Sequence, residues 1–142
     1  RCPTVAMTDR WDRAALQAGA MVALVFAVPF SIAARWAADS RDDGTLALWL
    51  SVGAVAGFAL GAGCAAWVQR CGMPLAHGLV TAVATYIVAQ AVFIAIRAIR
   101  GAEINWFAAL FNLSVVAGAG LLGGLLGRHL QSKGFRPSAG GS

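Results

Sequence analysis

The stretch that decides the fold is SVGAVAGFALGAG, residues 51–63, in which Gly53, Gly57 and Gly61 recur every four residues within an unbroken apolar run. A glycine inside a helix costs roughly 1 kcal/mol relative to alanine, so three on one face require an explanation. Glycines four apart leave a flat groove along a helix, into which another backbone can pack closely. Such grooves are typical of membrane helices, because lipid provides no hydrophobic force between helices.

The rest of the chain has the composition of a membrane protein. Of its 142 residues, 59% are hydrophobic and 12% are charged, whereas soluble domains carry about a quarter charged residues. Four stretches without Asp, Glu, Lys or Arg each exceed the roughly 20 residues that cross a bilayer. They predict an all-α, polytopic bundle of four transmembrane helices, near residues 14–34, 46–69, 75–96 and 106–127. The tryptophans fall near the ends of these spans, where indole rings lie at headgroup depth: Trp11, Trp36, Trp49, Trp67 and Trp106.

The charges between the spans predict the orientation of the chain. Seven basic and two acidic residues lie on the side that holds the termini and the second loop, whereas the first and third loops together hold four of each. Basic residues collect on the cytoplasmic side of membrane proteins, so we expect both termini in the cytoplasm. The basic residues then set topology, and we expect no nucleic-acid partner. The Ala- and Arg-rich composition favours a bacterial source, and hence a multi-pass protein of the inner (plasma) membrane.

The chain divides into one domain with two short extensions. We expect an N-terminal cytoplasmic arm at residues 1–13, a four-helix transmembrane domain at 14–130 and a flexible, Gly- and Ser-rich tail at 131–142. Met7 fits a translation start, which leaves open whether residues 1–6 belong to the native protein.

Two helices carry glycine grooves: Gly53, Gly57 and Gly61 on the second, and Gly120 with Gly124 and Gly123 with Gly127 on the fourth. We interpret these grooves as GxxxG-type packing within the bundle; the alternative is a docking face for another copy or subunit. The second and fourth helices run parallel, and Gly61 and Gly120 lie at similar depth. We therefore expect these two helices to cross closely at that pair.

Polar residues within the spans are candidates for a substrate path. Interhelical hydrogen bonds, worth about 0.6 kcal/mol on average, explain them as well, and we favour this structural role because no ionisable group joins them. Gln90 and Asn112 lie at matching depth, and an unpaired amide in hydrocarbon costs several kcal/mol. We therefore expect both amides to face the bundle interior and to hydrogen-bond each other or share one backbone carbonyl. If both instead lined a common water-filled cavity, transport would be favoured. The candidate path comprises Thr81, Thr85, Tyr86, Gln90 and Asn112.

Motifs for catalysis are missing from the sequence. It contains no HExxH, GxSxG or Walker A pattern. Cys71, His77 and His129 share one side and could in principle ligate zinc, but their spacing matches no metal motif. We therefore expect no catalytic residue, metal or cofactor.

The glycine placement also resembles a known family. The segment GFALGAGCAAWVQRCGMPLAHGLVTAVATY (57–86), followed by AGAGLLGGLLGRHL (117–130), is similar to the YrzE-like family of small four-helix bacterial membrane proteins. The resemblance covers about residues 50–130. It implies the four-span fold and carries over no site, because the family has no established activity.

These observations predict a non-catalytic integral membrane protein. The leading interpretation is an accessory or scaffolding subunit of a larger membrane complex, because the chain has no separate soluble domain and much close-packing surface. The alternative is a small oligomeric transporter or channel. Expected partners are the lipid bilayer and either other membrane subunits or further copies of the chain.

Overall fold

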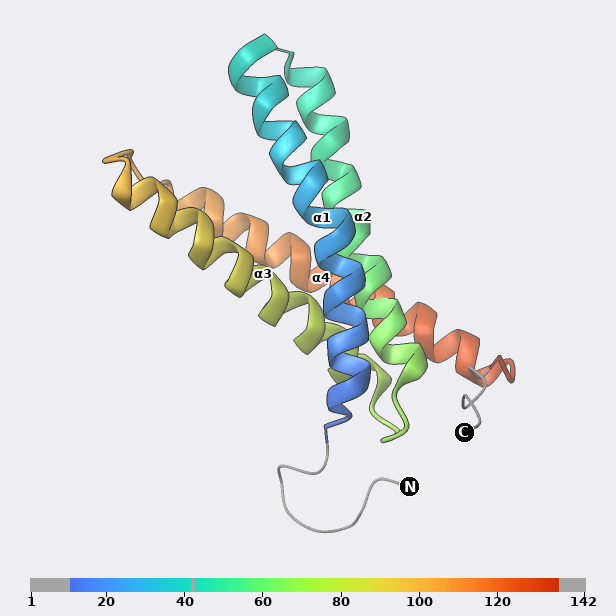
Figure 1. Cartoon of the computed structure of the whole chain (residues 1–142). Coiled ribbons are helices and arrows are strands. Elements are labelled where there is room, and N and C mark those ends of the chain that lie inside the picture. The colour runs from blue at the N-terminus through green and yellow to red at the C-terminus, as the bar shows by residue number, and fades with distance from the viewer. Residues whose placement is uncertain (1–10, 42, 136–142) are drawn as a thin grey trace.

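A computed structural model describes residues 11–41 and 43–135 (Figure 1). Its fold is all-α, with four helices: α1 (Arg13–Arg41), α2 (Gly44–Val68), α3 (Pro74–Ile99) and α4 (Trp106–Ser132). Each helix is long and apolar enough to cross a membrane, which confirms the four predicted helices. The first helix extends beyond the predicted span, because the charged segment after residue 34 continues as helix to Arg41.

The sequence encodes where each helix begins. The carboxylate of Asp12 accepts a hydrogen bond from the Ala15 backbone N–H at 3.1 Å, and that of Asp43 accepts one from Leu46 at 2.9 Å. At the start of α4, Asn105 plays the same part, and α3 begins with a proline that needs no N–H partner. These caps satisfy backbone donors that the first turn of a helix leaves unpaired.

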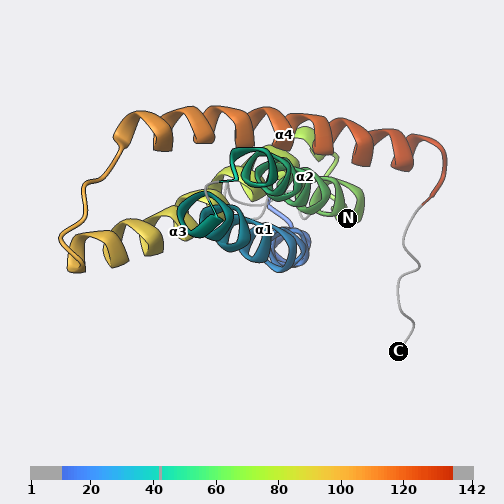
Figure 2. The ribbon, with the colours of Figure 1, turned by 90° about the horizontal axis from the view of Figure 1, so that it is seen from above.

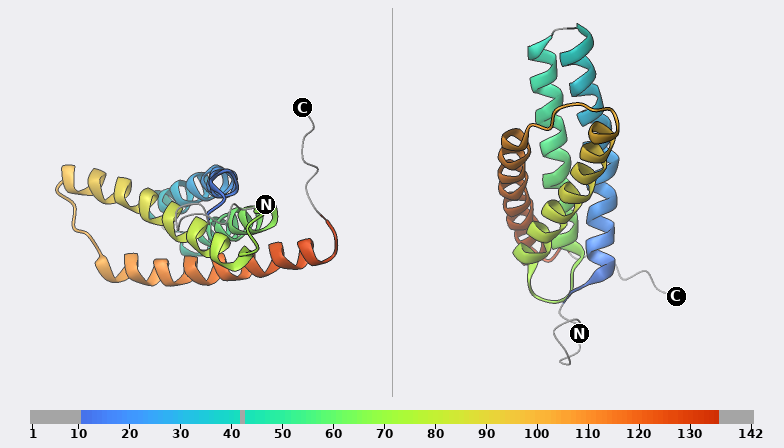
Figure 3. Two further views of the ribbon diagram at one scale, coloured as in Figure 1. Left: turned by 90° about the horizontal axis from the view of Figure 1, so that it is seen from below. Right: turned by 90° about the vertical axis from the view of Figure 1, so that its left-hand side faces the viewer.

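The helices form two hairpins that cross each other (Figure 1). α2 contacts all three other helices, whereas α1 and α4 do not contact each other within the described residues. The helices therefore follow the order α1, α2, α4, α3 around the bundle, as the right-hand view of Figure 3 shows. The first residues of α1, the turn at 69–73 and the end of α4 lie toward one end of the molecule.

At that end, here called the glycine end, the helices approach each other closely at glycines. A Cβ added to Gly61 would lie 2.5 Å from the Gly19 carbonyl oxygen of α1. One added to Gly78 on α3 would lie 2.9 Å from the Cα of Gly124 on α4. These contacts involve backbone atoms, so larger side chains would force the helices apart. The glycine end is defined by Gly19, Gly61, Gly63, Gly78, Gly120, Gly123, Gly124 and Gly127.

The predicted crossing of the second and fourth helices at Gly61 and Gly120 is wrong. The groove of Gly53, Gly57 and Gly61 faces α1, where it meets Phe30, Phe26, Ala27 and Ala23, and Gly120 and Gly124 face α3. α2 and α4 do pack closely, but through Gly63 against Gly123 and Gly127. Other helices of the same chain therefore fill the predicted grooves.

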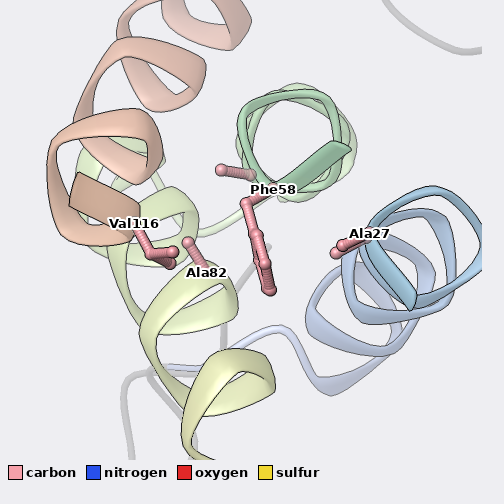
Figure 4. Close-up of a cluster of buried hydrophobic side chains, with 6 residues drawn as sticks. Ala27, Phe58, Ala82 and Val116 are labelled. Carbon is pink, nitrogen blue, oxygen red and sulfur yellow. The ribbon is translucent and has the colours of Figure 1, made fainter. Parts of the chain in front are cut away.

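A small apolar cluster lies between the four helices, beyond the glycine end. Phe58 of α2 projects toward α1 and α3, with Ala27, Ala82 and Val116 around it (Figure 4). Ala23 and Ala62 complete the cluster, and Tyr86 packs against it, with its ring centroid 6.1 Å from that of Phe58.

Beyond this cluster the two hairpins diverge, and α3 and α4 also draw apart, whereas α1 and α2 stay packed side by side (Figure 1). Figure 2 and the left-hand view of Figure 3 show α3 and α4 drawing apart as they approach their connecting segment. Arg100–Asn105 can bridge such a gap, since an extended chain covers up to about 3.4 Å per residue. We call this half of the molecule the cleft end.

The expected boundary of the C-terminal tail, at residue 131, needs correction. α4 continues to Ser132, and the side chain of Gln131 is held by α2. Its Nε2 donates to the carbonyl oxygens of Trp67 at 2.8 Å and Gln69 at 3.0 Å. Gln131 therefore satisfies two carbonyls at the end of α2, which would otherwise lack helical partners. Residues 1–10 and 136–142 of the expected arm and tail lie outside the described residues.

Candidate functional site

A cleft of about 480 Å³ occupies the cleft end of the molecule. All four helices contribute to its walls, and its deepest residues, Ala27, Phe58 and Val116, belong to the apolar cluster. The cleft exists because glycines and alanines bring the helices together at the glycine end, while larger side chains and the crossing of the hairpins keep them apart here. Its closed end is therefore the tightly packed half of the bundle.

Three of the five candidate path residues line this cleft: Tyr86, Gln90 and Asn112. Tyr86 spans the space between α3 and α4, because its hydroxyl donates to the Ala109 carbonyl oxygen at 2.9 Å. The phenol thus holds the two helices at a fixed separation where they begin to diverge.

The predicted hydrogen bond between Gln90 and Asn112 is wrong. Both amides lie on the wall of the same cleft, and neither donates to or accepts from the other in the part of the chain that the structure describes. The prediction assumed that α3 and α4 stay in contact up to their connection, whereas the two helices draw apart as they approach it (Figure 2). Two amides at matching depth therefore face a shared space.

The other two candidates lie below the cleft, in the packed half. His77, Thr81 and Thr85 follow each other at intervals of four residues along α3, and they are 0%, 3% and 6% exposed. Among the described residues, the Thr81 hydroxyl oxygen is buried without a hydrogen-bond partner. Such groups are uncommon in folded proteins and often mark a place for water or a ligand. Together with Tyr86 and Gln90, these side chains form a polar column from the cleft to the glycine end.

His77 closes the lower end of this column. Its Nε2 accepts the backbone N–H of Asp12 at 3.0 Å, and its Nδ1 lies 2.9 Å from the Met73 carbonyl oxygen. These partners require the neutral ring with the proton on Nδ1. The Trp11 ring packs against the imidazole at a centroid distance of 5.1 Å, so His77 joins the start of α1 to the start of α3.

Two further residues of the cleft, Arg35 and Arg97, figured in the sequence only as charges that set the topology. The Arg35 guanidinium carbon lies 4.9 Å from the centroid of the Phe93 ring, a cation–π contact between α1 and α3. Arg97 is one turn further along α3 than Phe93, and both line the cleft. The spacing of Phe93 and Arg97 by four residues was the available signal, because it places both on one helix face.

A second amide pair was missed at the opposite end. Gln69 Nε2 lies 3.4 Å from Gln131 Oε1, and Gln69 Oε1 accepts the Cys71 backbone N–H at 2.8 Å. A wider and more open hollow of about 660 Å³ lies beside this pair, between residues 72–76 and the end of α4. We regard the cleft as the better candidate site, because it gathers polar side chains from all four helices.

The described residues of the cleft wall carry no carboxylate, imidazole or thiol. The polar groups that face it are guanidinium, amide and hydroxyl groups, which bind and orient a ligand. Comparisons with protein families, curated proteins and solved structures give no match, and the resemblance to the YrzE-like family stays a prediction.

Proposed function

We propose that this protein is a small, non-catalytic transporter of the bacterial inner membrane that takes up its substrate in the cleft. In this proposal both termini are cytoplasmic, and the cleft opens toward the outside. The observation that carries it is that Gln90 of α3 and Asn112 of α4 line the same cleft. Amides in hydrocarbon need partners, and a cleft that admits water or a polar substrate provides them.

The polar column on α3 supports a route beyond the cleft. Thr85, Thr81 and His77 continue from the cleft into the packed half, where the Thr81 hydroxyl has no partner among the described side chains and backbone groups. The glycine contacts close this route in the conformation described. Passage would require the two hairpins to move relative to each other, as in transporters that expose a central site to each side in turn.

The orientation has a direct test. A cysteine introduced by Glu103→Cys lies at the cleft end, and one introduced by Lys133→Cys lies at the glycine end; both positions are exposed. We expect a membrane-impermeant maleimide to label the first variant in intact cells and the second only after lysis, because basic residues are retained in the cytoplasm. Labelling of the unmodified chain provides the background. The reverse pattern would place the termini outside.

Access of water to the cleft tests the transport proposal itself. We expect a charged thiosulfonate reagent added from outside to react with Gln90→Cys and Asn112→Cys at least about tenfold faster than with Val88→Cys and Leu110→Cys, because thiols ionise only where water reaches them. The controls lie two residues away at similar depth, and the native side chains are exposed on the outer surface, at 63% and 64%.

Equal, slow reaction at all four positions would contradict a water-filled cleft. In that case the transport proposal fails, and the accessory-subunit interpretation becomes the better one. The comparison does not depend on knowing the substrate.

A further inference from the structure

Two arginine side chains, those of Arg35 and Arg97, line the cleft. Arg35 lies over the Phe93 ring, and Arg97 donates from Nη1 to the Glu103 backbone carbonyl oxygen at 3.3 Å. Within the described chain, neither forms an ion pair, and no Asp or Glu lines the cleft. Among the described residues, the cleft wall therefore carries two positive charges and no negative one.

The cleft becomes apolar with depth. Below the two arginines come the amides of Gln90 and Asn112, and below these lie aliphatic and aromatic side chains: Leu24, Val28, Val55, Phe58 and Val116. A ligand that fits this gradient has an anionic group at one end and a hydrocarbon part at the other. Membrane phospholipids have this polarity, and guanidinium groups bind phosphate oxygens through paired, charge-assisted hydrogen bonds.

The positive charges of Arg35 and Arg97 and the apolar side chains deep in the cleft together favour an anionic phospholipid over a soluble anion. A soluble anion would use the two guanidinium groups and leave the apolar walls unoccupied. A zwitterionic lipid would place a cationic group beside Arg35 and Arg97, and like charges in a partly desolvated site repel each other.

We propose that the cleft binds an anionic phospholipid of the surrounding membrane, with its phosphate between Arg35 and Arg97 and its acyl chains against the apolar side chains around Phe58. This inference rests on the proposed function, since it names the ligand class of the same cleft. Phe93 holds the Arg35 guanidinium in place by stacking, and the Glu103 backbone carbonyl oxygen holds that of Arg97.

The test measures binding to the purified full chain in an uncharged detergent by calorimetry. The probes are short-chain (dihexanoyl) phosphatidylglycerol, the corresponding phosphatidylcholine, and glycerol phosphate as the headgroup without chains. We expect phosphatidylglycerol to bind at least about tenfold more tightly than either of the other two. Arg35→Gln and Arg97→Gln should each weaken it by about tenfold, because each removes a charge-assisted hydrogen bond to the phosphate.

Arg100→Gln is the matched control, since Arg100 is exposed at the end of α3 and lies outside the cleft wall. It should leave the affinity unchanged. Equal binding of the two lipids, tight binding of glycerol phosphate alone, or an equal effect of Arg100→Gln would each overturn the inference. Lipid binding without thiol labelling at positions 90 and 112 would support this inference and reject transport; labelling without lipid binding would do the opposite.

Discussion

We expect Gly123→Ala to lower the free energy of unfolding by about 2 kcal/mol, a typical cost of overpacking at a close contact. A Cβ at this position would collide with the Ala59 carbonyl oxygen and would lie 2.9 Å from the Gly63 backbone nitrogen. Both atoms belong to the α2 backbone, so no side chain can rotate away. The two helices would have to separate along their whole contact, and unfolding in detergent, followed by circular dichroism against added SDS, measures the loss.

Gly118→Ala is the control, because it makes the same chemical change on the same helix. A Cβ there meets nothing within 4 Å. Helix propensity should then raise stability by up to about 1 kcal/mol. If both variants changed stability equally, packing at the glycine end would contribute nothing beyond propensity, and our account of the fold would fail.

The sequence predicted the helices well, because both of their determinants are local. Apolar length and the absence of charge set the predicted spans. The capping residues Asp43 and Asn105, with Pro74, set the observed starts and were not used in the prediction. The predicted end of the first helix, at residue 34, was too early, since α1 continues to Arg41. A charged segment can remain helical where it leaves the hydrocarbon. Hydropathy marks the part of a helix that fits in lipid, not the helix itself.

Helix partners were harder to predict. The groove of Gly53, Gly57 and Gly61 signals close packing but does not identify the helix that fills it, and α1 rather than α4 does so. Gly63 carried a usable signal, since two residues rotate a helix face by about 200°. Gly61 and Gly63 therefore face nearly opposite directions, which places α2 between two closely packed neighbours.

The cleft could not have been predicted from depth alone. Gln90 and Asn112 do lie on facing helices, but the distance between the helices depends on their crossing angle. That angle follows from contacts near Gly78 and Gly120, far from the amides along both helices. The role of Arg35 depends in the same way on α1 reaching α3 at Phe93, a contact between distant parts of the chain.

Stability depends mainly on the glycine end of the molecule, and ligand binding on the cleft end. Backbone contacts at Gly61, Gly78 and Gly123 hold the bundle at the glycine end, so the helices can diverge at the cleft end without losing the fold. Substitutions in the cleft should therefore affect ligand binding more than stability. Substitutions at the glycine end, or at the polar contacts between helices there, should affect stability more than ligand binding.

His77→Ala should be among the most destabilising of these changes, at about 3 kcal/mol, because it combines a cavity with lost hydrogen bonds. The imidazole is 0% exposed, and both of its nitrogens have partners. Its loss would leave the Asp12 N–H without an acceptor at the start of α1 and remove the ring that packs against Trp11. SDS titration in detergent, as for the glycine variants, measures the effect.

His77→Phe separates the two contributions, since phenylalanine keeps a ring against Trp11 but cannot accept the Asp12 N–H or donate to the Met73 carbonyl. We expect it to retain part of the stability and to lose about 1 to 3 kcal/mol, the cost of leaving a buried donor unpaired. His129→Ala, at the exposed end of α4, should change stability by less than about 0.5 kcal/mol. Wild-type stability of His77→Phe would show that ring packing alone joins α1 to α3, and that the hydrogen bonds of His77 contribute nothing to holding the glycine end closed.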